Sequence, residues 1–217
     1  MLQAFEPLRL SAACRCGAVR ATVDASPVRG RRAGLHVVCY CDDCRAFARA
    51  VRRPDVLDEF GGTAIWQTTP ARLRFDFGAQ HLRCLRLSDK GMLRWHTACC
   101  NTPVANTMAS PGMPFVGLFH AFLGLAPAQA KAKLGPATFI YGRSAQGDVS
   151  AFAEPKASLR TILRIVGFLL REKIAGAHRP SPLFDDAGQP VSSPRILPAA
   201  EREALRKLDT WTRADAR

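Results

Sequence analysis

The sequence predicts a mainly β fold with a helical C-terminal extension, and three observations lead to that prediction. Between about residues 10 and 145, short runs of β-forming residues are separated by Gly, Pro, Asp and Ser. Two of these runs alternate apolar and polar residues with a period of two. From residue 146 onward the pattern changes to helical spacing, interrupted by a proline-rich stretch. We therefore expect a β domain over 10–145 and an extension over 146–217.

The β domain is expected to contain five recognisable strands. The runs RLRFDF (72–77) and LRCLRL (82–87) have the alternation of half-buried strands. Cys84, alone in the second run, is expected to be a buried thiol. The other three runs are enriched in β-formers without strict alternation: AVRATV (18–23), TAIWQT (63–68) and FIYG (139–142).

The longest apolar run is too short to cross a membrane. PFVGLFHAFLGLA (114–126) has about 13 residues, whereas a membrane-spanning helix needs roughly 20. We expect a core strand or a buried helix there, and no membrane span. The first sixteen residues contain Glu6 and Arg9 and lack the apolar stretch of a signal peptide. We therefore expect a cytoplasmic protein, whose cysteines serve as thiols or metal ligands and not as disulfides.

The extension is expected to be mostly helical. SLRTILRIVGFLLREKIAG (158–176) has helical spacing, with Ser158 as N-cap and Gly176 as the end. We expect this helix to pack on the β domain; a basic helix lying on a membrane surface is the alternative. The apolar residues expected to make the contact are Ile162, Val166 and Leu169.

Two further helices and a linker complete the prediction. A short helix over about 42–51 would carry two aspartates in its first turn, where the helix dipole favours them. The segment 179–198 contains five prolines and is typical of an extended linker or wrapping segment. A final helix is expected over about 199–213.

The formal charge of +13 raises the question of nucleic-acid binding. Residues 1–110 contain 16 basic and 9 acidic residues, and residues 111–217 contain 15 and 9. Because the excess is evenly spread, it indicates a solvated basic surface and argues against a nucleic-acid groove.

Seven of the eight cysteines fall into three groups. The first group is CRCG, in which Cys14 and Cys16 would project from one face of an extended strand onto a single metal, and Gly17 can take a positive φ. The second group is CYCDDCR, with cysteines at 39, 41 and 44 able to present three sulfurs to one ion. The third group, WHTACCNTP (95–103), adds a histidine.

The third group leaves a choice of ligands. His96 and Cys99 have the spacing of a ligand pair, and Cys100 follows immediately. Side chains of adjacent residues diverge, so we expect one of the two cysteines to be spare. The count then favours two zinc ions per chain. Four ligands would close a structural site (Cys14, Cys16, His96 and Cys99), and three would form an open site of the catalytic type (Cys39, Cys41 and Cys44).

The order and spacing of these three motifs resemble those of the glutathione-dependent formaldehyde-activating enzymes, which have a β-tent zinc fold. The resemblance covers about residues 10–145 and implies that the first and third motifs share a structural zinc. It also implies that the middle cysteines hold a zinc that a substrate thiol can complete. This sequence departs from the family pattern where His96 replaces a cysteine, Cys100 replaces a glycine and Asn101 is inserted.

The function expected from the resemblance is carbon–sulfur lyase-type chemistry. A small thiol such as glutathione would add to a small aldehyde, or be released from it, at the three-cysteine site. Arg45 is the nearest candidate to bind a carboxylate of the thiol, with an ordinary surface arginine as the equal alternative. A zinc module without enzymatic activity that binds a protein partner is the alternative function. A fourth protein ligand beside the three cysteines would favour that module, and the sequence does not indicate the oligomeric state.

Overall fold

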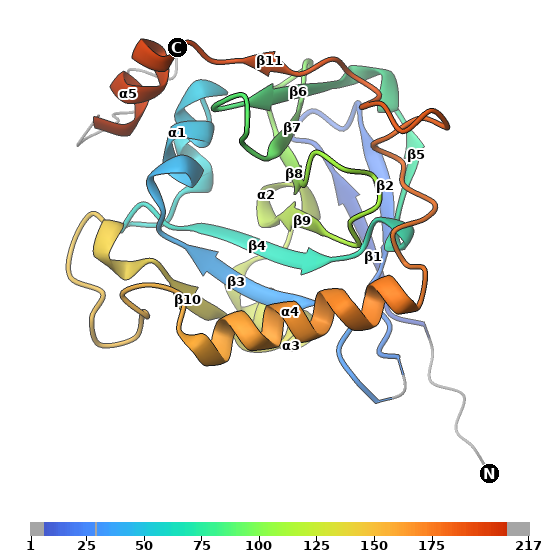
Figure 1. Ribbon diagram of the computed structural model, residues 1–217, viewed down its shortest axis with the longest axis horizontal. Helices are drawn as coiled ribbons and strands as arrows, with labels where there is room; N and C mark the ends of the chain where they lie inside the picture. The colour runs from blue at the N-terminus through green and yellow to red at the C-terminus, as the bar shows by residue number, and fades with distance from the viewer. Residues whose placement is uncertain (1–6, 29, 208–217) are drawn as a thin grey trace.

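The computed structural model of the protein describes residues 7–28 and 30–207, and all structural statements refer to these residues. Within them, eleven strands form two sheets (Figure 1). The smaller sheet has the strand order β1-β2-β5, and the larger has the order β10-β3-β4-β9-β8-β7-β6-β11. The predicted mainly β fold with a C-terminal helix is therefore confirmed.

The strands are β1 (Arg9–Ala13), β2 (Arg20–Asp24), β3 (Leu35–Cys39), β4 (Thr63–Thr68), β5 (Leu73–Phe77), β6 (Leu82–Arg86), β7 (Leu93–Thr97), β8 (Pro103–Thr107), β9 (Val116–Phe119), β10 (Thr138–Ile140) and β11 (Arg195–Ile196). The helices are α1 (Asp42–Ala50), α2 (His120–Leu123), α3 (Pro127–Leu134), α4 (Leu159–Ile174) and α5 (Ala199–Lys207), with short 3-10 helices η1 (Pro54–Val56), η2 (Pro70–Arg72), η3 (Ala79–His81) and η4 (Gly142–Ser144).

The five predicted strands correspond to β2, β4, β5, β6 and β10, with small differences at their ends. The apolar run 114–126 divides into β9 and α2, so it contains both of the structures considered for it. Strands β1, β3, β7, β8 and β11 were not predicted. In β8 all five residues are buried, including Asn106 and Thr107, so the strand shows no alternation.

The core lies on both faces of the larger sheet. Trp66, Trp95 and Leu118 point from this sheet toward the smaller one and form the main core with residues of β1, β2 and β5. On the opposite face, Phe47 of α1 packs against Phe119, with ring centroids 5.5 Å apart. Helix α1 is thereby held against the end of β3, where the second cysteine group lies.

Helix α4 runs along the lower side of the molecule in Figure 1. Ser158 is its N-cap as predicted, with the hydroxyl oxygen accepting a hydrogen bond from the amide of Thr161 at 3.2 Å. The predicted packing face is wrong in part, because Ile162 and Val166 are 45% and 44% exposed. The helix is anchored by the larger side chain of Phe168, which is 5% exposed.

The proline-rich segment and α5 wrap around the β domain. Leu183 and Phe184 enter the main core, and β11 pairs in parallel with β6 at the edge of the larger sheet. Helix α5 packs on α1, where Arg206 forms an ion pair with Asp43. The predicted final helix is seen as far as Lys207, and its expected remainder lies outside the described residues. The division of the chain at residue 145 stays a prediction.

No helix in the described part of the chain is both long enough and apolar enough to span a membrane.

Candidate metal centres

The first cysteine pair lies in the tight turn between β1 and β2, and not on an extended strand as expected. The sulfurs of Cys14 and Cys16 are 3.6 Å apart. Gly17 has the predicted positive φ of 77°, and its amide donates to the carbonyl oxygen of Cys14 at 2.9 Å. The amide of Val19 donates to the Cys14 sulfur at 3.3 Å. The two sulfurs of this turn are close enough to bind one metal ion.

The third motif forms the turn between β7 and β8, and it presents both adjacent cysteines to the first pair. Cys99 Sγ lies 3.7 Å from Cys14 Sγ and 3.8 Å from Cys100 Sγ. Asn101 follows with a positive φ of 54°, which reverses the chain directly after the cysteines. The expectation that one of the two would point away and be spare is therefore wrong. All four sulfurs lie within 4.8 Å of one another: Cys14, Cys16, Cys99 and Cys100.

His96 lies apart from this four-cysteine cluster. Along β7 the side chains alternate, so Trp95 points into the main core and His96 points to the other face. There its ring contacts Phe47, with centroids 6.5 Å apart. In the candidate ligand set, Cys100 therefore takes the place predicted for His96. The turn after β7 brings Cys99 and Cys100 back to the face of the sheet that carries the main core.

The four-cysteine cluster fits a zinc ion. Tetrahedral zinc with bonds of about 2.3 Å to sulfur separates its ligands by roughly 3.8 Å, and the sulfur distances in the cluster agree with that value. Although burial raises the pKa of Cys100, hydrogen bonds with Thr102 and Thr97 lower it more, to about 5. Cys100 is therefore ready to bind as a thiolate. The site joins the β1–β2 turn to the β7–β8 turn, which are far apart in the sequence.

The second group lies at the junction of β3 and α1. Cys39 ends the strand, Cys41 is the N-cap residue of the helix, and Cys44 is in the first helical turn. Their sulfurs lie within 4.8 Å of one another. The helix N-terminus stabilises negative charge that lies close to it. In the described part of the chain, no fourth Cys, His, Asp or Glu joins the group at that distance.

The thiols of this group differ in their pKa values. Hydrogen bonds with Cys39 and Cys41, followed by the positive charge of Arg94, hold the pKa of Cys44 well below its usual value. Hydrogen bonds with Cys41 and Cys44, together with burial, raise the pKa of Cys39. One thiolate is therefore stabilised before any metal binds, and a divalent cation would compete for the remaining protons.

Arg45 does not face the three cysteines. Its guanidinium donates to the carbonyl oxygens of Tyr40, at 3.0 Å, and Ser144, and forms an ion pair with Asp42 at 2.5 Å. These bonds fasten α1 to the segment that follows β10. The arrangement gives no support to Arg45 as the substrate-binding residue, because Nη1 and Nη2 are engaged by these partners and Arg45 is not among the residues that line the cavity beside the cysteines.

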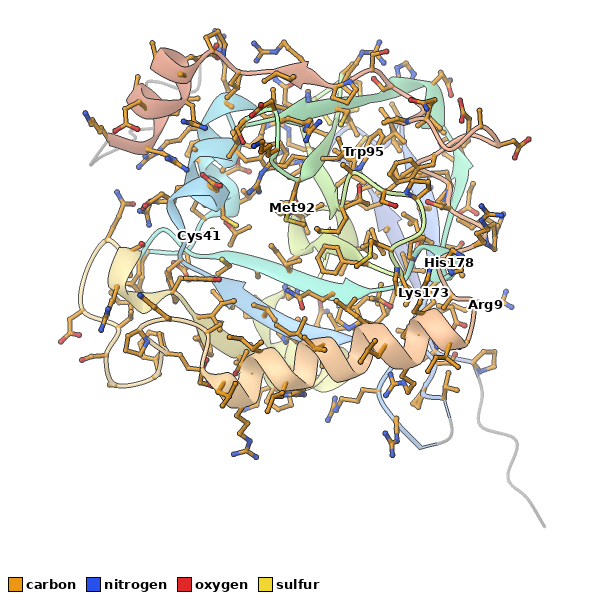
Figure 2. All side chains as sticks on the ribbon, in the orientation of Figure 1. Arg9, Cys41, Met92, Trp95, Lys173 and His178 are labelled. Atoms are coloured by element: carbon orange, nitrogen blue, oxygen red, sulfur yellow. The ribbon has the colours of Figure 1, made fainter. Side chains whose placement is uncertain are left out.

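The three-cysteine group opens on a cavity of about 710 Å³. Cys41 and Met92 both line it, and Figure 2 shows both residues above α4 in this view. Helix α4 contributes an apolar wall to the cavity from Ile162, Ile165 and Val166. The partial exposure of Ile162 and Val166 is explained in this way, since they face the cavity and not the packed core.

Three polar side chains in the cavity wall were missed by the sequence reasoning. Arg94 and Asn106 are 5% and 4% exposed, and Gln67 lies near them on β4. Arg94 is a charged residue in an otherwise mostly apolar strand, and this signal was available in the sequence. Nothing in the local sequence distinguishes Asn106 or Gln67 from residues on the outer face of a strand.

A second cavity, of about 860 Å³, lies on the opposite face of the larger sheet. It is lined by His36 and His120, whose ring centroids are 4.7 Å apart. His36 Nδ1 is 2.8 Å from the carbonyl oxygen of Gly135, so this nitrogen carries the proton. Neither histidine belongs to a cysteine group, as expected.

Comparisons with known proteins place the sequence in a family and supply no activity. The family described as "Family of unknown function (DUF6151)" matches residues 8–194. No protein with a curated description matches. A crystal structure of a Rhodobacter sphaeroides protein, 20% identical, matches with a TM-score of 0.39 and covers 60% of this chain and 99% of that one.

Proposed function

The chain belongs to DUF6151, a family of unknown function, and we propose that it is a zinc-dependent enzyme acting on small thiols. In this proposal Cys14, Cys16, Cys99 and Cys100 hold a structural zinc, and Cys39, Cys41 and Cys44 hold a second zinc that is open to the cavity. The reaction proposed is the addition of a small thiol, such as glutathione, to a small aldehyde, or the reverse.

One observation carries the proposal. Three cysteine sulfurs lie within 4.8 Å of one another, no further side chain of ligand type joins them among the described residues, and the group lines a cavity of about 710 Å³. Closed structural sites have four protein ligands, whereas catalytic sites have three and keep one position for water or substrate. A module that only binds a protein partner has no need of an open position inside a cavity.

Zinc in such a site supplies Lewis acidity and favours the ionised form of a bound thiol. The residues of the chain would position the thiol, stabilise the charge of the cysteines and limit the access of water. The three cysteines fix the position at which the thiol is held, and the helix N-terminus below them stabilises their charge. Helix α4 lies over the cavity with apolar side chains, and it would limit the access of water to the reacting groups.

Thiol binding to the zinc-loaded protein tests this proposal. We expect calorimetry with glutathione and with 2-mercaptoethanol to show binding accompanied by proton release, measured in buffers of different ionisation enthalpy. In Cys41→Ser this response should disappear, whereas Cys84→Ala, which changes a buried thiol outside both groups, should retain it. A wild-type protein that retains its zinc and shows no response to either thiol would refute the proposal and favour the non-enzymatic module.

A further inference from the structure

A row of polar side chains crosses the larger sheet on the face that carries the three cysteines. Arg94 on β7 lies directly opposite Asn106 on β8, Asn106 lies opposite Gly117 on β9, and Gly117 lies opposite Gln67 on β4. Residues that lie opposite one another in a sheet point to the same face. Cys39 shares this face, because its neighbour two residues away on β3, Val37, pairs with Ile65, which is two residues from Gln67.

Because Gly117 has no side chain, the row has a gap between Asn106 and Gln67. A Cβ at this position would come within 2.9 Å of Ile65 Cγ2, so packing requires glycine. The result is a polar floor made of Arg94, Asn106 and Gln67, all of which line the cavity beside the cysteines. We call these three side chains the polar floor.

Each member of the polar floor has a buried polar atom that the protein does not satisfy. Arg94 Nη1, Asn106 Oδ1 and Gln67 Oε1 have no hydrogen-bond partner in the parts of the chain that are described. Buried polar atoms are hydrogen-bonded in most proteins, and an unpaired buried atom costs about 1–3 kcal/mol. Three such atoms along the wall of one cavity indicate a place for a polar ligand.

The charges around the cavity favour an anion. Among the described residues, no carboxylate forms an ion pair with Arg94. The two acidic residues of the cavity wall are already paired, Asp42 with Arg45 and Asp43 with Arg206. Lys90 adds a further positive charge at the rim. A planar guanidinium binds a carboxylate through two hydrogen bonds, which makes Arg94 the natural receptor for that group.

The position of Arg94 limits the length of the ligand. Arg94 and Cys44 line the same cavity, and the guanidinium of Arg94 lies 5.5 Å from the ring centroid of Phe47 on α1, the helix that also carries Cys44, so the receptor for the carboxylate lies near the sulfurs that would surround a bound thiol. A molecule whose carboxylate is only two or three carbon atoms from its sulfur is short enough to contact both groups within this cavity. The carboxylates of glutathione lie farther from its sulfur.

We propose that Arg94, Asn106 and Gln67 select a short thiol acid, in which Arg94 binds the carboxylate while the sulfur occupies the open position at Cys39, Cys41 and Cys44. The two amide oxygens would accept hydrogen bonds from an amino group, so amino-acid thiols of the cysteine type belong to this class. The inference rests on the proposed function of the three-cysteine site, and it adds the specificity of that site.

A pair of ligands with the same shape tests the inference on the wild-type protein. We expect 3-mercaptopropionate to bind the zinc-loaded protein about tenfold or more tightly than 3-mercaptopropionamide, which lacks the charge. Calorimetry measures both dissociation constants, and metal analysis after each titration checks that zinc has been retained. This comparison needs no variant, so it remains decisive if a change at Arg94 prevents folding.

A substitution of Arg94 tests whether this residue causes the selectivity. Arg94→Met should abolish the preference for 3-mercaptopropionate and leave the affinity for the amide nearly unchanged. Arg83→Met, which removes an exposed arginine from the neighbouring strand β6, should keep the preference. Glutathione binding should depend on Arg94 much less than 3-mercaptopropionate binding does.

Two results would overturn the inference in different ways. If the wild-type protein binds both ligands equally, or if Arg94→Met weakens both by the same factor, Arg94 only balances the charge of the thiolates, and the proposed function stands without this specificity. If neither ligand binds to a protein that retains its zinc, the proposed function of the site fails together with the inference.

Discussion

At the scale of single residues, the direction of a side chain decides which residues can share a metal. His96 and Cys99 have ligand spacing in the sequence, but His96 is still part of β7 and points away from the first cysteine pair. Cys100 has no such spacing, yet the turn closed by Asn101 brings its sulfur to within 3.8 Å of Cys99. The cluster of candidate ligands therefore has four members, as expected, with Cys100 in place of His96.

Substituting each of these two residues separately gives the first test. Cys100→Ser should lower the zinc content by about one equivalent and reduce the free energy of unfolding by several kcal/mol, since metal binding contributes to folding in such sites. His96→Ala should leave the zinc content unchanged and alter stability by only about 1 kcal/mol. Metal analysis and thermal unfolding measure both. Loss of zinc in His96→Ala, with retention in Cys100→Ser, would contradict the assignment.

At the scale of elements, α4 depends on its N-terminus to stay in place over the cavity. The Ser158 hydroxyl caps the helix, and the carboxylate of Glu154 accepts hydrogen bonds from the amide and hydroxyl of Ser158 at 2.8 and 2.9 Å. The only buried side chains of the helix are Thr161 and Phe168, as far as the structure is described. With so few buried side chains, the cap is an important part of the attachment.

Ser158→Ala should therefore destabilise the protein by about 1 kcal/mol, the usual cost of losing an N-cap. For a chain of this size the melting temperature should fall by about 2–4 °C. Ser193→Ala, a change at an exposed serine of the wrapping segment, is the matched control and should have no measurable effect. A melting temperature equal to that of the wild type would mean that the cap does not stabilise α4.

Sequence patterns predicted part of the local structure, including five of the eleven described strands, and predicted contacts between distant segments poorly. Alternation identified β5 and β6, and the N-cap signal placed the start of α4 at the correct residue. Strand β8 and the polar floor were missed, because a residue such as Asn106 becomes informative only when the strands beside it are known. The motif spacing assigned six of the seven grouped cysteines to the clusters that the structure shows, with Cys100 as the exception.

At the scale of the whole molecule, the two cysteine clusters have different positions and different structural consequences. The four-cysteine cluster joins the turn of the smaller sheet to a turn of the larger sheet, so a zinc ion there would hold the two sheets together. The three-cysteine cluster lies at the other face of the larger sheet, between α1 and the cavity covered by α4. A zinc ion in the first cluster would therefore stabilise the fold, whereas the second cluster lines a cavity that a ligand could enter.

The zinc content per chain of the full-length protein tests this account most directly. We expect about two zinc ions per chain in the wild type and about one in Cys41→Ser, and the ion that remains should be the one that resists a chelator longer, because its site has four protein ligands. A wild-type protein with one zinc ion per chain, unchanged in Cys41→Ser, would contradict the open metal site on which the proposed function depends.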